Sequence, residues 1–161
     1  MASWQEVEEA APALAERVRD RFAAHGLGVL ATLRRDGRPR VSGVEPLIAD
    51  GELWLAMMPG SRKGLDLRRD PRFALHAASV DTEVRHGDAK VAGWAVEVLD
   101  EQAGERFRLA FAAGTGRAPP PGPMQLFRAD LDEVVLVRPE GELLVIESWH
   151  EGRGVTRLQR A

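Results

Sequence analysis

Near the N-terminus the apolar residues recur at a helical interval, at Leu14, Val18 and Phe22. Ser3 and Glu6 have the spacing of a capping box, which predicts the start of a helix. Pro12 is expected to begin a second helical segment or to kink the first. The pair His25-Gly26 predicts the end of this helical region, because glycine is favoured just past the last turn.

From Leu27 onward the period becomes that of strands. Runs that are apolar or alternating, bounded by turn residues, predict strands over Leu27–Leu33, Arg40–Ala49, Glu52–Met57, Phe73–Ala78 and Ala89–Leu99. Asp50-Gly51 is the clearest hairpin turn, so the first three strands are expected to form a meander. Closing strands are predicted over Gln125–Phe127, Glu133–Val137 and Glu142–Trp149.

Two further helices are expected among the strands. One covers Lys63–Arg69 and ends at Asp70-Pro71, because the residue before proline disfavours the helical region. The other is capped by Asp100 and runs through Ala112, and the Gly- and Pro-rich segment Gly114–Pro123 is predicted to be a loop. Since most strands are linked by hairpins, the predicted fold class is mainly β (α+β), an antiparallel barrel with peripheral helices in a single domain over residues 1–161.

Composition narrows the classes of function. A formal net charge of -3 over 161 residues argues against a general nucleic-acid binder. The absence of cysteine excludes disulfides and a cysteine nucleophile, and the four histidines show no ligand spacing, so no metal site is expected. Met1–Ala15 lacks the basic and apolar regions of a secretion signal, and no apolar run could span a bilayer. We therefore expect a cytoplasmic protein without a membrane partner.

The stretch most suggestive of chemistry is Pro59-Gly60-Ser61-Arg62-Lys63, which joins a predicted strand to a predicted helix. The N-terminus of a helix attracts anions through free N–H groups and its dipole, and arginine and lysine add charge-assisted hydrogen bonds. These residues predict a phosphate site. On charge alone, a solvated basic turn is an equally good interpretation.

This stretch, with the Leu67-Arg68-Arg69-Asp70-Pro71-Arg72-Phe73 that follows it, resembles the region after the third strand in the pyridoxamine 5'-phosphate oxidase-like superfamily. The order of predicted elements is similar over most of the chain. The resemblance implies a split β-barrel of about six antiparallel strands that binds FMN or the deazaflavin F420. It assigns the cofactor phosphate to Ser61, Arg62 and Lys63, and it implies a homodimer with two cofactor sites at the interface.

The same resemblance assigns the residues along the rest of the cofactor. Arg40 and Ser42 are expected to point to it and Val41 to line its ring, with an ordinary half-buried strand as the alternative. Met57 and Met58 are expected beside the ring system, although methionine is more often a filler of the core.

Three more residues are assigned by resemblance alone. Lys90 is similar to a polar position that family members direct at the flavin, and a surface lysine is the alternative. Trp149 and Arg153 resemble an aromatic and a basic residue that reach the cofactor of the partner subunit. For Trp149, burial in the barrel is the alternative interpretation.

These residues predict a flavin- or deazaflavin-dependent oxidoreductase acting on a small organic substrate, whose cofactor carries the hydride chemistry. FMN is modestly favoured over F420, whose polyglutamate tail would need an extended basic groove. The alternative is a non-catalytic FMN- or haem-binding carrier of the same fold, in which His76, His86 or His150 could be the axial ligand. The sequence identifies neither the substrate nor whether the chain is catalytically active.

Overall fold

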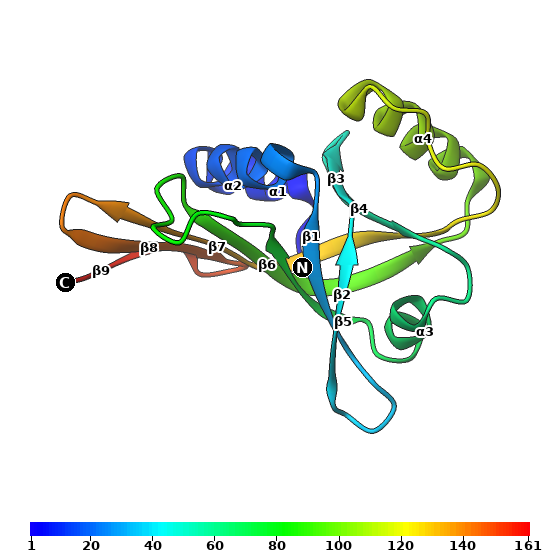
Figure 1. The fold of residues 1–161 in the computed structure, drawn as a ribbon, viewed down its shortest axis with the longest axis horizontal. Coiled ribbons are helices and arrows are strands. Elements are labelled where there is room, and N and C mark those ends of the chain that lie inside the picture. Colours follow the sequence, from blue (N-terminus) through cyan, green and yellow to red (C-terminus); the bar gives the residue numbers. More distant parts are fainter.

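One nine-stranded antiparallel sheet forms the body of the molecule (Figure 1). The computed structural model describes residues 1–161. Its strands are β1 (Gly28–Leu33), β2 (Pro39–Val44), β3 (Pro46–Ala49), β4 (Glu52–Met57), β5 (Arg72–Ala77), β6 (Asp88–Val98), β7 (Gln125–Glu140), β8 (Leu143–His150) and β9 (Gly154–Arg160). The helices are α1 (Trp4–Ala10), α2 (Pro12–His25), α3 (Arg62–Arg69) and α4 (Glu101–Thr115). The predicted fold class is confirmed.

The order of the strands shows where the barrel is split. Strands pair in the order β2-β1-β5-β6-β7-β4-β3, so β2 and β3, which follow each other in the chain, lie at opposite ends. The chain passes between them at Glu45-Pro46, and proline has no N–H with which to continue a ladder. The predicted three-strand meander is therefore wrong. The run 40–49 is two strands, of which β2 pairs with β1 and β3 pairs with β4.

The two N-terminal helices begin and end where local signals predict. Ser3 Oγ accepts a hydrogen bond from the Glu6 N–H at 3.3 Å, and the Glu6 carboxylate accepts one from the Ser3 N–H at 2.7 Å. Pro12 opens α2, and Gly26 ends it with φ of 62°. The buried faces of α1 and α2 pack on the sheet and form the main core with it.

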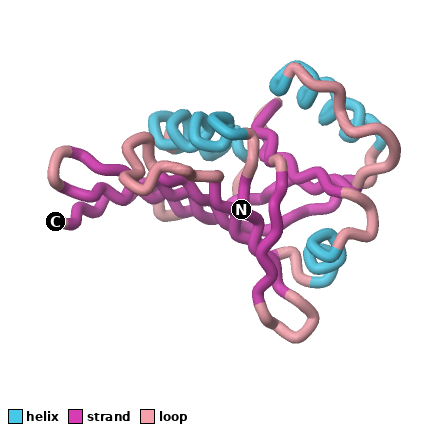
Figure 2. The backbone as a smooth tube through the Cα atoms, in the orientation of Figure 1, coloured by secondary structure: helices cyan, strands magenta, loops and turns pink.

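A second, smaller core lies under α4. Trp54 of β4 contacts Phe107 with ring centroids 6.2 Å apart, and Phe107 contacts Phe111 at 5.9 Å. Leu126 of β7 and Ala103 complete this cluster. In Figures 1 and 2, α4 stands apart from α1 and α2, on the side of the molecule that carries β3 and β4.

The C-terminal strands extend beyond the barrel as an arm, on the left in Figure 2. β7 is one continuous strand of 16 residues where the pattern predicted two; β8 pairs with its second half, and β9 pairs with β8. The pattern did not predict β9, because every residue from Gly154 to Arg160 is exposed and no buried face imposes an alternation. No helix is long and apolar enough to cross a membrane.

Candidate functional site

Helix α3 starts at the split in the barrel. Ser61 is its N-cap, and Ser61 Oγ accepts a hydrogen bond from the Gly64 N–H at 3.3 Å. Lys63, in the first turn, extends to β2, where its Nζ donates to the carbonyl oxygen of Gly43 at 2.7 Å. Strand β2 has β1 as its only ladder partner, so Lys63 ties the start of α3 to the strand that borders the split.

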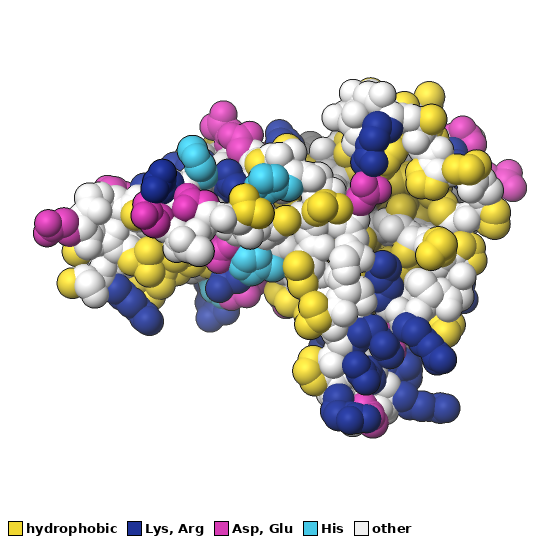
Figure 3. Space-filling view, viewed as in Figure 1, with side chains coloured by type: hydrophobic (Ala, Val, Ile, Leu, Met, Phe, Trp, Pro, Cys, Tyr) yellow, Lys and Arg dark blue, Asp and Glu magenta, His cyan; other side chains and the backbone are white.

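A basic cleft of about 560 Å³ lies between α3 and the turn that joins β1 to β2. It is lined by Arg34, Arg35, Arg40, Arg62 and Arg69, together with Asp36, Leu65 and Asp66. Five arginines against two aspartates give this lining a formal charge of +3. Figure 3 shows Lys and Arg side chains gathered over the β1–β2 hairpin and α3, in the lower right of the view. A cleft of one sign of charge concentrates ligands of the other.

Some arginines of the basic cleft are paired with a carboxylate, and others are not. Asp66 is shared between Arg40, at 2.6 Å, and Arg69, at 3.0 Å. Arg34, Arg35 and Arg62 have no carboxylate partner, so three guanidinium groups are available to an anion.

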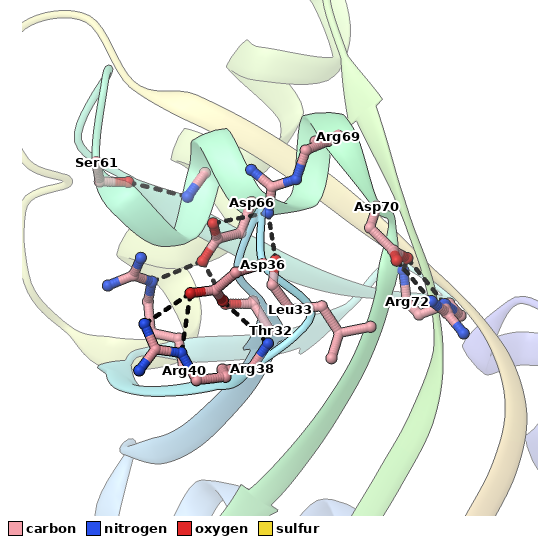
Figure 4. Close-up of polar contacts among 11 residues, drawn as sticks. Thr32, Leu33, Asp36, Arg38, Arg40, Ser61, Asp66, Arg69, Asp70 and Arg72 are labelled. Atoms are coloured by element: carbon pink, nitrogen blue, oxygen red, sulfur yellow. Dashed lines mark hydrogen bonds and ion pairs between the residues drawn. The ribbon is translucent and has the colours of Figure 1, made fainter.

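Asp66 connects three elements at the base of the cleft (Figure 4). Its Oδ2 accepts hydrogen bonds from Thr32 Oγ1 of β1 at 3.0 Å and from Arg40 Nε of β2 at 2.6 Å, and its Oδ1 accepts one from Arg69 Nη2 of α3 at 3.0 Å. Burial by itself would raise the pKa of Asp66. The hydrogen bonds from Arg40, Arg69 and Thr32 outweigh burial and lower that pKa below its ordinary value. The carboxylate therefore stays ionised at neutral pH.

An apolar cleft of about 460 Å³ opens on the other side of the first turn of α3. Its lining comes from the end of β4, the buried face of α4 and the loop that follows α4, and includes Met57, Met58, Lys63, Phe107, Phe111 and Met124. Pro120, Pro121 and Pro123 close one wall. The loop is held over the cleft by Arg108, whose Nη1 donates to the carbonyl oxygen of Pro120 at 3.2 Å and Nη2 to that of Gly122 at 2.9 Å.

The two clefts meet at α3. Arg62 lines the basic cleft and the next residue, Lys63, lines the apolar one. Likewise, Arg40 of β2 lines the basic cleft and Gly43 of the same strand lines the apolar one. The arrangement suits a ligand that carries an apolar ring at one end and an anionic group at the other.

Most of the residues predicted from the sequence lie around these two clefts. Ser61 caps the helix between them, and Val41 and Ser42 are on the stretch of β2 that connects them. Met57 is buried at the end of β4, whereas the side chain of Met58 is 79% exposed at the mouth of the apolar cleft. Val41 is 69% exposed.

The other predicted residues lie elsewhere in the chain. Lys90 is exposed on β6, in a cross-strand row with His76, Val29 and Gly43, so it lies three strands from β2, or about 14 Å away. Trp149 is 4% exposed and belongs to the core of its own chain. Arg153 is in the turn between β8 and β9, on the arm. The roles of these three residues, like those of the predicted residues around the clefts, stay predictions.

The sequence interpretation missed Asp66 as a member of this site. Asp66 lies three residues after Lys63 and three before Arg69, a spacing that places it beside Arg69 on one helical face. An acid in the middle of a basic helix was therefore a usable signal. Its bonds to Thr32 and Arg40 were not foreseeable, because they depend on how α3 packs against β1 and β2.

Comparison with known proteins supports the fold. The family model described as pyridoxamine 5'-phosphate oxidase matches residues 14–138. No curated protein matches the chain. Three similar solved structures each share less than 25% sequence identity and therefore show the fold alone.

One of them is a pyridoxamine 5'-phosphate oxidase-related, FMN-binding protein from Nostoc punctiforme, with a TM-score of 0.63, 17% identity and coverage of 94% of this chain and 96% of that one. A haem-binding protein from Mycobacterium smegmatis has a TM-score of 0.62, 19% identity and coverage of 92% and 88%. PhzG from Burkholderia lata, solved with tetrahydrophenazine-1-carboxylic acid, has a TM-score of 0.63, 18% identity and coverage of 93% and 87%.

Proposed function

The chain belongs to the pyridoxamine 5'-phosphate oxidase family, and from that premise we propose that it is an oxidoreductase that binds a phosphorylated flavin or deazaflavin. The observation that carries this proposal is the meeting of a basic and an apolar cleft at the first turn of α3. The ring system occupies the apolar cleft, and the anionic end occupies the basic one. A small organic substrate then approaches the exposed side of the ring.

The residues present fit such a cofactor. Arg40 and Arg62 supply guanidinium groups that match a phosphate in shape and charge. Ser61 and Lys63 fix the start of α3, whose N–H groups and dipole favour an anion at that place. Met58 offers exposed, polarisable surface at the mouth of the apolar cleft, and the buried side chains of Met57 and Phe111 form part of its lining.

When bound, a cofactor of this class supplies hydride transfer. The chain contributes binding and orientation. Its arginines neutralise the anionic end, its apolar cleft excludes water from the ring, and the loop held by Arg108 covers one side of that cleft.

Of the two cofactors, the basic cleft favours F420. One phosphate needs only the guanidinium groups of Arg40 and Arg62. The cleft, however, continues to Arg34 and Arg35 at the turn between β1 and β2. Neither of these two arginines has a carboxylate partner. A cofactor whose anionic groups extend along a tail uses all of this surface, whereas FMN leaves Arg34 and Arg35 without a ligand.

A homodimer is part of the proposal. The sheet face away from α1 and α2 carries a cross-strand row of small or apolar residues, Val41, Ala31, Ala74 and Ala92, which lie opposite one another on β2, β1, β5 and β6. Val41 and Ala74 are exposed in this row, and Val29 beside it is 43% exposed. A second copy that covers this face would bury it.

The test is a titration of the purified protein with FMN, F420 and haemin, followed by absorbance and fluorescence. Lys63→Ala and Arg62→Ala are compared with the wild type, and Arg160→Ala, which removes an exposed cation at the C-terminus, is the matched control. We expect FMN or F420 to bind and both site variants to weaken binding about tenfold or more, because each loses a charge-assisted hydrogen bond or ion contact. A Soret band with haemin and no flavin binding would refute the proposal in favour of a haem carrier, although no histidine lines either cleft.

A further inference from the structure

We propose that Asp66 is the positioning residue of the basic cleft, because its buried carboxylate holds Arg40 and Arg69 in the orientation that binds the anionic end of the ligand. The inference rests on the proposed function for the identity of that ligand. The orientation of the two arginines is a property of the chain itself and can be measured without any ligand.

The geometry of the carboxylate supports this role. The Asp66 side chain is 5% exposed, and both of its oxygens accept hydrogen bonds. Arg40 uses its Nε for this contact and makes no other side-chain bond. Its two terminal nitrogens, with four N–H groups between them, therefore stay free to bind two oxygens of a phosphate at once.

A fixed arginine binds better than a mobile one. An arginine side chain gives up much rotamer freedom when it orders around a ligand, and a protein group that orders it in advance reduces this loss. Arg40 projects from β2 and Asp66 from α3, so their contact also sets the distance between the strand and the helix on either side of the cleft.

Charge and position predict opposite effects for Asp66. Its carboxylate is a negative charge at the base of an anion site, so by charge alone its removal would tighten the binding of a phosphate. If it acts by position, its removal weakens that binding, because Arg40 loses the partner that orients it and Arg69 keeps only its bond to the carbonyl oxygen of Leu33. The sign of the change therefore separates the two explanations.

The experiment compares Asp66→Asn and Asp66→Glu with the wild type. The ligands are FMN with its phosphate-free analogue riboflavin, and F420 with the deazaflavin chromophore that lacks the phosphate and tail. We expect both variants to bind FMN or F420 about tenfold or more weakly, on the scale of a charged hydrogen bond, and to bind the phosphate-free analogue as the wild type does. Asp66→Glu keeps the charge and moves it by one methylene, so a loss in that variant cannot come from the charge.

Asp70→Asn is the matched control. Asp70 follows α3 and pairs with Arg72 at 2.6 Å, outside the cleft, so we expect its variant to keep wild-type selectivity. A thermal melt of each variant shows that it is folded. Should Asp66→Asn not fold, Asp66→Glu decides the question.

The Arg40 Nε–H resonance in an NMR spectrum is the readout that needs no ligand. In the wild type, the bond to Asp66 should protect this proton from exchange, and in Asp66→Asn the protection should fall. If neither cofactor binds the wild type, the proposed function fails, while this resonance still tests the positioning. Tighter FMN or F420 binding in Asp66→Asn, an equal loss for the phosphate-free analogue, or an unchanged Arg40 resonance would each overturn the inference.

Discussion

A β-carbon placed on Gly64 would lie 2.2 Å from Oε1 of Gln125, which is closer than any real contact. Gly64 is in the first turn of α3, and Gln125 is the first residue of β7. The start of the helix therefore lies directly against the strand, and with the Gln125 side chain in this position only glycine fits. Gln125 is held in place through its Nε2, which donates to Glu97 at 3.1 Å, and Glu97 in turn pairs with Arg68 of the same helix at 2.6 Å.

This contact reverses the usual effect of a glycine-to-alanine change in a helix. Such a change normally stabilises by about 0.5–1 kcal/mol. At Gly64, overpacking against Gln125 should outweigh that gain and lower the free energy of unfolding by about 1–2 kcal/mol in urea denaturation. Gly104→Ala, in α4 with no atom within 4 Å of the added carbon, is the control and should be stabilised. Equal stabilisation of both variants would show that α3 does not pack against Gln125.

The lowered pKa of Asp66 predicts a pH dependence of stability. Because the folded pKa lies below the unfolded value of about 3.9, the ion pairs of Asp66 stabilise the protein fully above that value and lose their effect as the pH falls through the folded pKa. At pH 7 we expect the free energy of unfolding of Asp66→Asn to be about 1–3 kcal/mol lower than that of the wild type. The difference should shrink in urea titrations as the pH falls below the unfolded pKa of about 3.9 and through the lower folded pKa. A difference that is independent of pH would mean that the carboxylate charge contributes nothing.

Arg34 and Arg35 should distinguish the two cofactors. Both line the basic cleft beyond the proposed phosphate site at Arg40 and Arg62, and neither has a carboxylate partner. The double variant Arg34→Ala/Arg35→Ala should bind F420 about tenfold or more weakly and FMN almost normally, because only F420 carries anionic groups beyond its phosphate. The loss for F420 should also diminish as salt is raised. An equal loss for both cofactors would place the phosphate itself at the β1–β2 turn.

The exposed sheet face predicts the site of subunit contact. Ala74→Arg puts a long charged side chain in the middle of the row formed by Val41, Ala31, Ala74 and Ala92. We expect this change to convert a dimer into a monomer in size-exclusion chromatography with light scattering, because an unpaired charge cannot be buried in an apolar interface. Leu109→Arg, on the exposed side of α4, is the control and should leave the mass unchanged. A dimeric Ala74→Arg protein would locate the interface elsewhere.

The sequence predicted correctly those features whose interacting residues lie close together in the chain. The capping box at Ser3 and Glu6, the helix start at Pro12 and the cap of α4 at Asp100 all lie where predicted, since each requires neighbours only a few residues away. The basic turn at Ser61–Lys63 was found for the same reason. Its charged residues are consecutive in the sequence, and the short helix that follows can be predicted from neighbouring residues.

The pairing of strands that are distant in the sequence could not be predicted in this way. The apolar pattern over residues 40–49 predicts extended chain but does not say that its two halves join opposite ends of a sheet. The single strand β7 was predicted as two, because the alternation is interrupted around Asp130 and Asp132 although the ladder with β6 continues past them with a register shift. Strand β9 had no pattern to find, since it has no buried face.

By itself, then, the sequence determined where the helices begin to within a residue, the antiparallel β class and the place of the basic turn at Ser61–Lys63 before a helix. The tertiary structure decided that Arg62 and Lys63 face two different clefts, that Gln125 requires Gly64, and that Asp66 joins Thr32, Arg40 and Arg69. The physical reason is that local signals depend on backbone geometry over one or two turns. A cleft, by contrast, depends on which distant segments pack together, and many sequences satisfy the same local pattern with different partners.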